Sequence, residues 1–425
     1  MLSALLLSVF ACGGNEPASK PASKPSAAAA TPAPEAPMAT VQEVPPTGPL
    51  PTLFLAQAQF IKDAAGKPKP GPAAMVLWQK GADGWKSYKV EDADSNVFHK
   101  ILAYKGGLLS IGAEKAMLKE WKVAGGKWTQ ETWWNPKWEG KFNRLRDVEI
   151  GDVNGDGQDD VVVATHDFGV VGVGSWVGDK LVFTELDKAA DTFVHEVEIG
   201  DIDGDGKNEF FVTPSGRNQS SGKSQPGQVR MYRWDGTTYK ATLVDDLGGS
   251  HAKEILAVNL DGSKKAELYS VMEAETELGP DGKARVVKPV EIRHYILGKD
   301  GSFTHEVVAT IDDKQCRFLV PGDFDGDGKT DLMAAAMKTG IWFISRDASG
   351  KWVSRNIETS SSGFEHTAYA TDLDGDGKLE LYVAADEQRE LRSYLWNAAT
   401  SSFDRTTIGP IAKDTITWNM TAAQF

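Results

Sequence analysis

The stretch that decides the fold is Asp152-Val-Asn-Gly-Asp-Gly-Gln-Asp-Asp160, a nine-residue segment dense in side-chain oxygens. Four other segments align with it and begin at Asp201, Asn259, Asp323 and Asp372, 49 to 64 residues apart. Each follows an alternating apolar stretch and precedes a β-rich one, and two more strand–turn–strand units fit before the next copy. Four strands at this period indicate one blade of a β-propeller.

The number of blades follows from a polar residue that lies six positions before each motif. The same local pattern, without an acidic loop after it, occurs around His99 and Asn419, so seven inner strands are expected. The last inner strand has no partners after it, whereas three strands between residues 53 and 90 precede the first complete blade. We therefore predict an all-β, seven-bladed β-propeller over residues 51–425, with the closing blade shared between N- and C-terminal strands so that no sheet edge stays open.

The acidic motifs have the composition of Ca²⁺ loops. Their pattern offers side-chain oxygens at positions 1, 3, 5 and 9 and a backbone carbonyl at position 7, and Ca²⁺ takes six to eight oxygens. Four copies are complete, and their 15 carboxylates favour a bound cation because like charges repel. We expect four structural Ca²⁺ ions, held by Asp152, Asn154, Asp156, Gln158 and Asp160, by Asp201, Asp203, Asp205, Lys207 and Glu209, by Asp323, Asp325, Asp327, Lys329 and Asp331, and by Asp372, Asp374, Asp376, Lys378 and Glu380.

Two alternatives to this interpretation can be compared with it. A single Asp-Gly-Asp-Gly segment is also typical of a polar hairpin turn, but four copies in register argue against that. An EF-hand would need Glu at position 12, where the second motif has Val212. The copy at Asn259 is degenerate, with Ser263 at position 5 and Lys264 in place of glycine. We expect no ion there, and Lys264 or Lys265 could supply the positive charge.

These motifs resemble the VCBS/FG-GAP repeats found in integrin α-subunit propellers and in many bacterial surface proteins. The resemblance covers roughly residues 97–425; Phe168-Gly169 matches the "FG" half of the repeat name, and the "GAP" half is absent. It implies an extracellular Ca²⁺-stabilised propeller used in adhesion or carbohydrate binding, and occasionally as a lyase or dehydratase scaffold. Fold alone does not determine which of these applies.

The N-terminal 50 residues predict an exported, anchored protein. Residues 1–12 resemble a bacterial lipoprotein signal, because the apolar run Leu2–Ala11 ends directly before Cys12, the expected lipidation site. The alternative is an ordinary secretory signal that is cleaved nearby. Residues 13–50 are rich in Pro, Ala and Ser and are expected to form a disordered tether. The predicted location is the bacterial outer membrane or cell surface, through the lipid anchor only, with the periplasmic face also open.

The starts of the seven inner strands are the candidate ligand site. Their side chains should surround one mouth of the central channel, on the face opposite the acidic loops, and six of the seven are basic or titratable. Such a ring suits a carboxylate, phosphate or sulfate group, and its histidines could bind a transition metal or act as acid and base. The alternative is a set of solvated polar residues. The seven are His99, Arg146, His195, Lys253, Arg317, His366 and Asn419.

Other features are weaker candidates. The connections 214–227, with Arg217 and Asn218, and 273–288 should project on the same face as the ring, and long loops on a rigid scaffold often bind ligands. Trp128, Trp133, Trp134 and Trp138 could stack on sugar rings, although packing at a blade junction is the favoured interpretation. The remaining histidines, His166, His251, His294 and His305, are expected to be surface or packing residues.

Composition narrows the function classes. A formal charge of −14 disfavours nucleic acid as a partner. The leading hypothesis is a Ca²⁺-stabilised binding or adhesion propeller that recognises an acidic glycan or a cell-surface protein at the channel mouth. The alternatives are a carbohydrate-active enzyme, such as a polysaccharide lyase or sugar dehydratase, and a structural envelope protein. No catalytic motif at a recognisable spacing is present, although propeller enzymes assemble their sites from separate blades.

Overall fold

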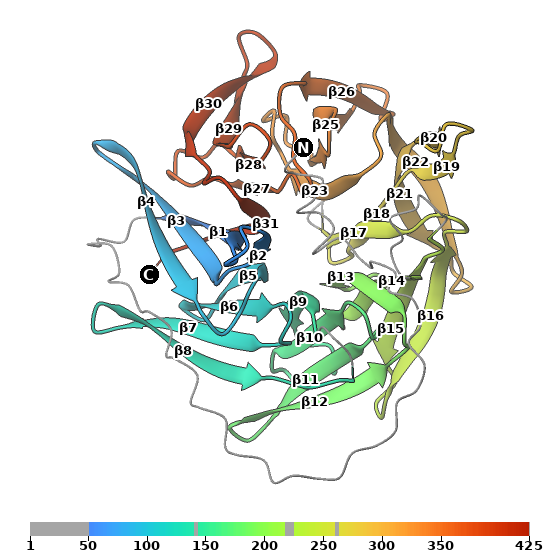
Figure 1. Cartoon of the computed structure of the whole chain (residues 1–425). Coiled ribbons are helices and arrows are strands. Elements are labelled where there is room, and N and C mark those ends of the chain that lie inside the picture. The colour runs from blue at the N-terminus through green and yellow to red at the C-terminus, as the bar shows by residue number, and fades with distance from the viewer. Residues whose placement is uncertain (1–50, 140–142, 217–224, 260–262, 425) are drawn as a thin grey trace.

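The computed structural model describes residues 51–139, 143–216, 225–259 and 263–424, and every regular element among them is a β-strand. Seven sheets stand around a central axis like the blades of a propeller (Figure 1). The predicted all-β, seven-bladed architecture is confirmed. No helix in the described part of the chain is long and apolar enough to cross a membrane. The predicted signal, Cys12 and the tether lie outside the described residues.

Six blades are four-stranded antiparallel sheets in which the chain runs outward from the axis. Blade 2 contains β5 (Phe98–Tyr104), β6 (Gly107–Gly112), β7 (Leu118–Ala124) and β8 (Lys127–Trp134), blade 3 contains β9 (Leu145–Gly151), β10 (Asp160–Thr165), β11 (Val171–Val177) and β12 (Lys180–Asp187), and blade 4 contains β13 (Thr192–Gly200), β14 (Glu209–Gly216), β15 (Gln228–Trp234) and β16 (Tyr239–Asp246). Blade 5 contains β17 (Ala252–Val258), β18 (Glu267–Met272), β21 (Val290–Leu297) and β22 (Phe303–Ile311), blade 6 contains β23 (Cys316–Gly322), β24 (Asp331–Ala336), β25 (Gly340–Arg346) and β26 (Trp352–Glu358), and blade 7 contains β27 (Ala368–Thr371), β28 (Glu380–Ala385), β29 (Glu390–Asn397) and β30 (Ser402–Pro410).

Blade 1 closes the ring from both chain ends, as the sequence predicts. Its strands from the axis outward are β31 (Thr415–Ala423), β1 (Thr52–Lys62), β3 (Ala73–Gly81) and β4 (Gly84–Asp92), and the short β2 (Pro68–Pro70) pairs with the end of β1. β31 and β1 pair antiparallel over eight residue pairs, with Leu55 opposite Met420. β1 is thus paired on both sides, with β31 and β3, and the last strand of the chain is held by the first.

The core is a set of seams between blades. Seven clusters of buried apolar side chains each lie between two adjacent blades, and together they go around the whole ring. At the junction of blades 1 and 2, for example, Phe54 packs edge-to-face on Trp128 with ring centroids 6.2 Å apart. Burial of apolar surface stabilises by about 25 cal/mol per Å², so each blade depends on both of its neighbours.

The connections lie on two faces. The acidic loops follow the inner strands on one face, which we call the acidic-loop face, and the inner strands begin on the opposite face, the ring face. The connection 273–288 reaches out from the ring face as a hairpin of β19 (Glu275–Leu278) and β20 (Ala284–Lys288). A turn joins the two strands of this hairpin, in which the Gly282 amide donates to the Gly279 carbonyl at 2.9 Å.

Candidate functional site

The acidic loops are all closed by hydrogen bonds to their own carboxylates. In the first loop, Asp152 accepts hydrogen bonds from the amides of Gly155 and Gly157 at 2.7 and 2.8 Å. Both glycines have left-handed backbone angles, φ 76° and 83°, which other residues adopt at a cost. Asp160 at position 9 accepts from the Val153 amide at 3.1 Å. The sequence therefore folds each motif into a tight turn with its carboxylates on the inside.

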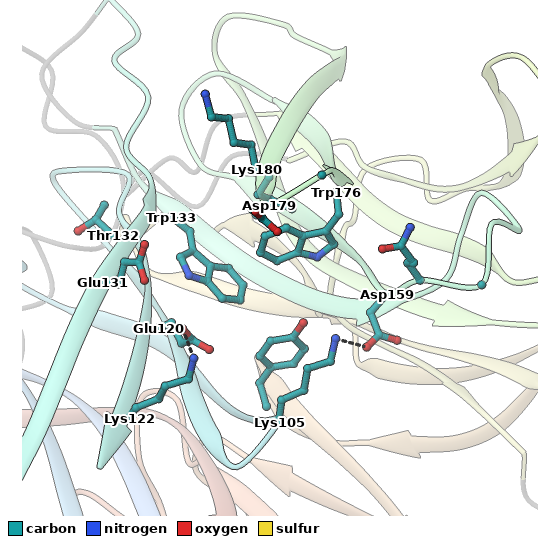
Figure 2. Close-up of a pocket in the computed structure, with 15 residues that line it drawn as sticks. Lys105, Glu120, Lys122, Glu131, Thr132, Trp133, Asp159, Trp176, Asp179 and Lys180 are labelled. Atoms are coloured by element: carbon teal, nitrogen blue, oxygen red, sulfur yellow. Dashed lines mark hydrogen bonds and ion pairs between the residues drawn. The ribbon is translucent and has the colours of Figure 1, made fainter. Parts of the chain in front are cut away.

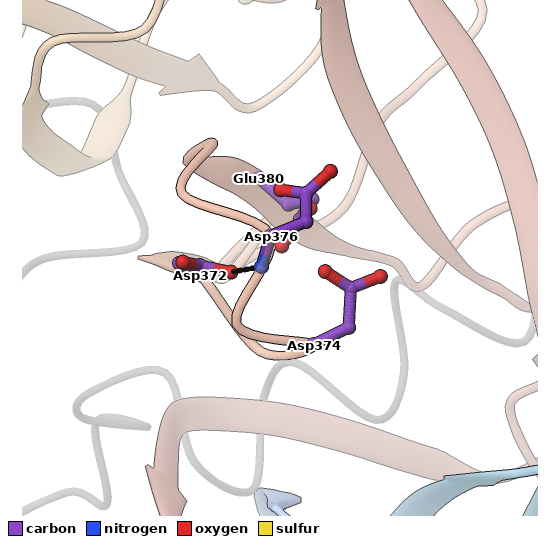
Figure 3. A group of neighbouring side chains, drawn as sticks. All are labelled: Asp372, Asp374, Asp376 and Glu380. Carbon is purple, nitrogen blue, oxygen red and sulfur yellow. Dashed lines mark hydrogen bonds between the residues drawn. The ribbon is translucent and has the colours of Figure 1, made fainter.

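In three of the four complete loops the carboxylates converge. Each of these groups offers oxygens that all lie within 4.8 Å of one another, and Figure 3 shows the last of them. The groups are Asp201, Asp203 and Glu209, then Asp323, Asp325 and Asp331, and finally Asp372, Asp374, Asp376 and Glu380. Converging hard oxygens on a small loop are the ligands that Ca²⁺ prefers, so the residues present fit this cation.

Electrostatics also favour a cation at these loops. Burial, followed by the charge of the neighbouring Asp325, raises the pKa of Asp331 to about 7. Burial likewise raises the pKa of Asp160, Glu209 and Glu380, each at position 9 of its loop. A divalent cation would offset both the burial and the repulsion that disfavour the charged form of these carboxylates.

The loops differ in the amide or basic side chains that already contact their carboxylates. In the first loop Asn154 stands at position 3, and its amide donates to Asp160 at 3.1 Å. In the second loop Arg233 of β15 lies 2.6 Å from Asp203 and 2.7 Å from Glu209, so an ion must compete with this guanidinium. In the last loop Lys80 of β3 lies 2.9 Å from Asp374 and competes with an ion in the same way. Among the described residues, the third loop has no ion pair with a basic group from another strand, so we expect it to bind Ca²⁺ more tightly than the second and last loops.

Position 7 of each loop was predicted to supply a backbone carbonyl to the ion. In the last two loops the residue at this position is a lysine, and its side chain contacts the aspartate at position 5. Lys329 Nζ contacts Asp327 at 2.8 Å, and Lys378 Nζ lies 3.5 Å from Asp376. These lysines therefore partly neutralise position 5 of their own loops. The degenerate copy at Asn259 falls partly outside the described residues, and the described remainder of it contributes no group of three candidate ligands.

The central channel is the site where the inner strands meet. A cavity of about 390 Å³ is lined by residues of all seven inner strands. Four of the seven predicted ring residues line it: His99, Arg146, Arg317 and Asn419. His195, Lys253 and His366 are buried beside the channel and do not line this cavity. Of the seven predicted ring residues, four therefore line the channel cavity and three are buried beside it.

Sequence reasoning missed the carboxylates of the channel. The same cavity is lined by Asp147, Glu196, Glu198 and Glu254, and burial raises the pKa of the three glutamates well above the usual range. A signal for them exists in the sequence. An acidic residue directly follows the ring residue in three consecutive repeats, at Asp147, Glu196 and Glu254.

The basic residues of the channel are paired with these and other acids. Glu365 lies between two guanidiniums: it contacts Arg317 and lies 3.8 Å from Arg146, which is also 3.4 Å from Glu196. Burial alone would lower the pKa of Lys100, but carboxylates outweigh it and raise the pKa well above normal, with Asp147 at 2.8 Å. An anionic ligand would have to displace these pairs, so the channel is a poorer anion site than the basic residues alone suggest.

Five histidines near the channel are buried, and three of these lie together. His99 contacts the Leu145 carbonyl, and His366 lies 2.7 Å from the Ser361 hydroxyl. His195 instead has two histidine neighbours that the ring pattern missed, His166 and His251, at ring centroid distances of 5.1 and 5.7 Å. Burial lowers the pKa of His99, His166, His195 and His251, and that of His366 to about 4, so all are neutral at pH 7.

The four tryptophans between residues 128 and 138 all take part in packing between blades. Trp128 is 1% exposed, and Trp134 stacks on Phe183 with ring centroids 4.0 Å apart. Trp138 donates from its indole to Glu185 at 2.7 Å. Trp133 is half-buried and packs at the edge of the junction between blades 2 and 3, so all four tryptophans lie at blade junctions, as the favoured interpretation expected. Arg217 and Asn218 in the connection 214–227 lie outside the described residues.

Comparisons with known proteins agree with the geometry. Residues 323–383 match the FG-GAP-like repeat family. No curated protein matches the sequence. Similar solved structures include a Bacteroides fragilis protein assigned as a 6-phosphogluconolactonase (TM-score 0.52, 13% identity, 88% of this chain and 98% of that one covered) and cobalt-substituted apocarotenoid oxygenase from Synechocystis (0.53, 12%, 91% and 95%). At these identities the likeness shows the fold alone.

Proposed function

We propose that this chain, which is an FG-GAP repeat β-propeller, is an exported Ca²⁺-stabilised binding protein that recognises a glycan or a cell-surface partner. The observation that carries the proposal is the convergence of carboxylates in the acidic loops. When bound, Ca²⁺ would neutralise each loop and tie an inner strand to the next strand of its blade. The loops then serve as structural clamps, and the faces of the propeller remain free to bind.

The site of attachment follows from the N-terminal sequence. We propose lipidation at Cys12, with residues 13–50 as the tether that holds the propeller away from the membrane. Metabolic labelling with a palmitate analogue tests this step: the chain should take up label, and Cys12→Ala should abolish it. Labelling that persists in Cys12→Ala would contradict a lipid anchor at this residue.

Thermal unfolding with and without calcium tests the function of the loops. Extracellular Ca²⁺ modules bind with Kd of about 10⁻⁴–10⁻³ M. At 10 mM Ca²⁺, one such site stabilises the folded state by roughly 1.4–2.7 kcal/mol, and four sites by roughly 6–11 kcal/mol. EGTA should therefore lower the Tm by several degrees. A Tm that is the same in EGTA and in Ca²⁺ would contradict the proposal.

A matched pair of variants separates calcium binding from general packing. Glu380 stands at position 9 of a complete loop, and Glu267 stands at position 9 of the degenerate copy. Each accepts a hydrogen bond from the tyrosine two residues later, at 3.3 Å from Tyr382 and 2.6 Å from Tyr269. Glu380→Gln should remove about one site's share of the Ca²⁺ stabilisation, whereas Glu267→Gln should leave that increment unchanged.

A further inference from the structure

A second cavity lies away from the channel, between blades 2 and 3 on the acidic-loop face (Figure 2). Its volume is about 780 Å³, within the range of about 300–1,000 Å³ that is typical of small-molecule sites. Its walls come from the β5–β6 turn, β7, β8, the first acidic loop and the β11–β12 turn. We call it the interblade cleft.

Aromatic rings form one side of the interblade cleft. Trp133 of β8 and Trp176 of β11 stand edge-to-face, with centroids 5.4 Å apart and planes at 82°, and Tyr104 lies 5.6 Å from Trp133. Both indoles are half-buried. Trp134, the next residue along β8, is instead stacked on Phe183 in the blade junction. The register of β7 and β8 shifts between the pairs Leu118–Trp134 and Lys119–Thr132, so Trp133 is the extra residue of a β-bulge. The bulge places both indoles against blade 3, with Trp133 beside Trp176 at the cleft.

Charged groups of both signs surround these rings. Three lysines and four carboxylates line the cleft, for a formal sum of −1: Lys105, Lys122, Lys180, Glu120, Glu131, Asp159 and Asp179. Lys105 pairs with Asp159 at 3.2 Å and Lys122 with Glu120 at 2.8 Å. An anionic ligand gains no net attraction here, and a purely apolar ligand would remove these charges from water without replacing their hydrogen bonds.

We infer that the interblade cleft binds a neutral saccharide. The face of an indole is partially negative and attracts the polarised C–H groups of a pyranose ring, and two perpendicular indoles offer a face and an edge to the same ring. Sugar hydroxyls both donate and accept, so they can bond to carboxylates and ammonium groups alike. The inference rests on the proposed function, because it names a site and a ligand class for it.

The first acidic loop connects this site to calcium. Asp159 belongs to the loop 152–160 and forms part of the cleft wall through its pair with Lys105. An ion in that loop would hold this wall in place. Saccharide affinity should therefore fall when calcium is removed, even at temperatures where the propeller stays folded.

Tryptophan fluorescence titration of the full propeller tests the inference. The probes are the neutral hexasaccharides cellohexaose, mannohexaose, xylohexaose and chitohexaose, with hexagalacturonate as the acidic counterpart. At least one neutral probe should bind saturably, and Trp133→Ala and Trp176→Ala should each weaken it tenfold or more. Trp234→Ala, a half-buried tryptophan that ends the third strand of blade 4, is the matched control and should leave the affinity unchanged. Trp133→Phe keeps an aromatic ring and guards against a folding defect.

The outcomes separate this inference from the proposed function. Neutral binding that survives Trp133→Ala and Trp176→Ala, or no neutral binding at millimolar probe, overturns the cleft assignment. A probe that binds only while Arg146 is intact places the glycan in the channel, which overturns the cleft and supports the proposed function. Saccharide binding in the cleft with no response of the Tm to calcium supports the cleft and overturns the calcium role.

Discussion

The closure of the ring can be tested through Asp386, a buried carboxylate that links blade 7 to the closing blade. Asp386 follows β28 and accepts hydrogen bonds from the Thr417 amide at 3.0 Å and the Thr417 hydroxyl at 3.2 Å. Thr417 lies in β31, the innermost strand of blade 1. Burial raises the pKa of Asp386 from 3.8 to about 7. The junction therefore contains a carboxyl group that the folded state holds protonated at pH 5.

The sign and size of the effect follow from this pKa. Between pH 4 and 7 the folded state binds a proton that the unfolded state has lost, so stability falls as the pH rises through this window. A shift of about three units corresponds to about 4 kcal/mol. Asp386→Asn keeps an oxygen acceptor for Thr417 and cannot ionise. We expect it to exceed the native chain in stability by about 1.6 kcal/mol at pH 5 and by about 4 kcal/mol at pH 8, so that the gain grows by about 2.5 kcal/mol between the two pH values.

Urea denaturation followed by tryptophan fluorescence at pH 5 and pH 8 measures this difference. Gln57→Leu is the matched control, because Gln57 donates to the same Thr417 hydroxyl at 3.1 Å and has no ionisable group. Its effect on the free energy of unfolding should be equal at the two pH values. If Asp386→Asn also shifted stability equally at both, the argument that a buried, protonated carboxyl group holds this junction would be refuted.

Three further outcomes are expected. Trp418→Ala should lower the free energy of unfolding by about 3–5 kcal/mol in urea denaturation, because this ring is only 6% exposed and packs against His99 at the start of the channel. A loss below about 1 kcal/mol would contradict that packing. The contribution of His366 to stability should fall by roughly 3 kcal/mol as the pH drops from 6.5 to 4, opposite in sign to that of Asp386, because the unfolded state binds the proton that buried His366 refuses. The change in stability over this pH range should therefore differ by about that amount between the native chain and His366→Asn, and equal changes would count against it. Lys119→Met should cost about 3–5 kcal/mol of the free energy of unfolding, because it leaves buried Asp92 without the ammonium group that lies 2.7 Å away. Adding Asp92→Leu should restore much of this loss. A double variant no more stable than the single one would speak against this pair.

The fold was predictable because its signals are local. The acidic turns recur at a blade-length period, and the surplus strands near residues 53–90 match the lone inner strand around Trp418. The partners of the channel residues were not predictable in this way. Arg146 and Glu365 are 219 positions apart and meet only because blades 3 and 7 face the same axis. No local pattern encodes such a pairing.

In the candidate sites, too, contacts between sequence neighbours could be predicted and contacts between distant residues could not. The ligands within each acidic loop are neighbours in sequence, so their convergence in three loops could be expected from composition and spacing. Arg233, which occupies two carboxylates of the second loop, comes from another strand and gave no sequence signal. Trp133 was considered only as one of a cluster, and its true neighbour, Trp176, lies in the next blade.

By itself, the sequence determined the repeating unit, the number of blades, the shared closure and the position of the acidic turns, because alternation and turn chemistry act over a few residues. Only the tertiary structure decided which charges neutralise one another around the axis and which aromatic rings meet between blades. Those contacts depend on the radius and twist of the closed ring, which arise from all seven junctions together.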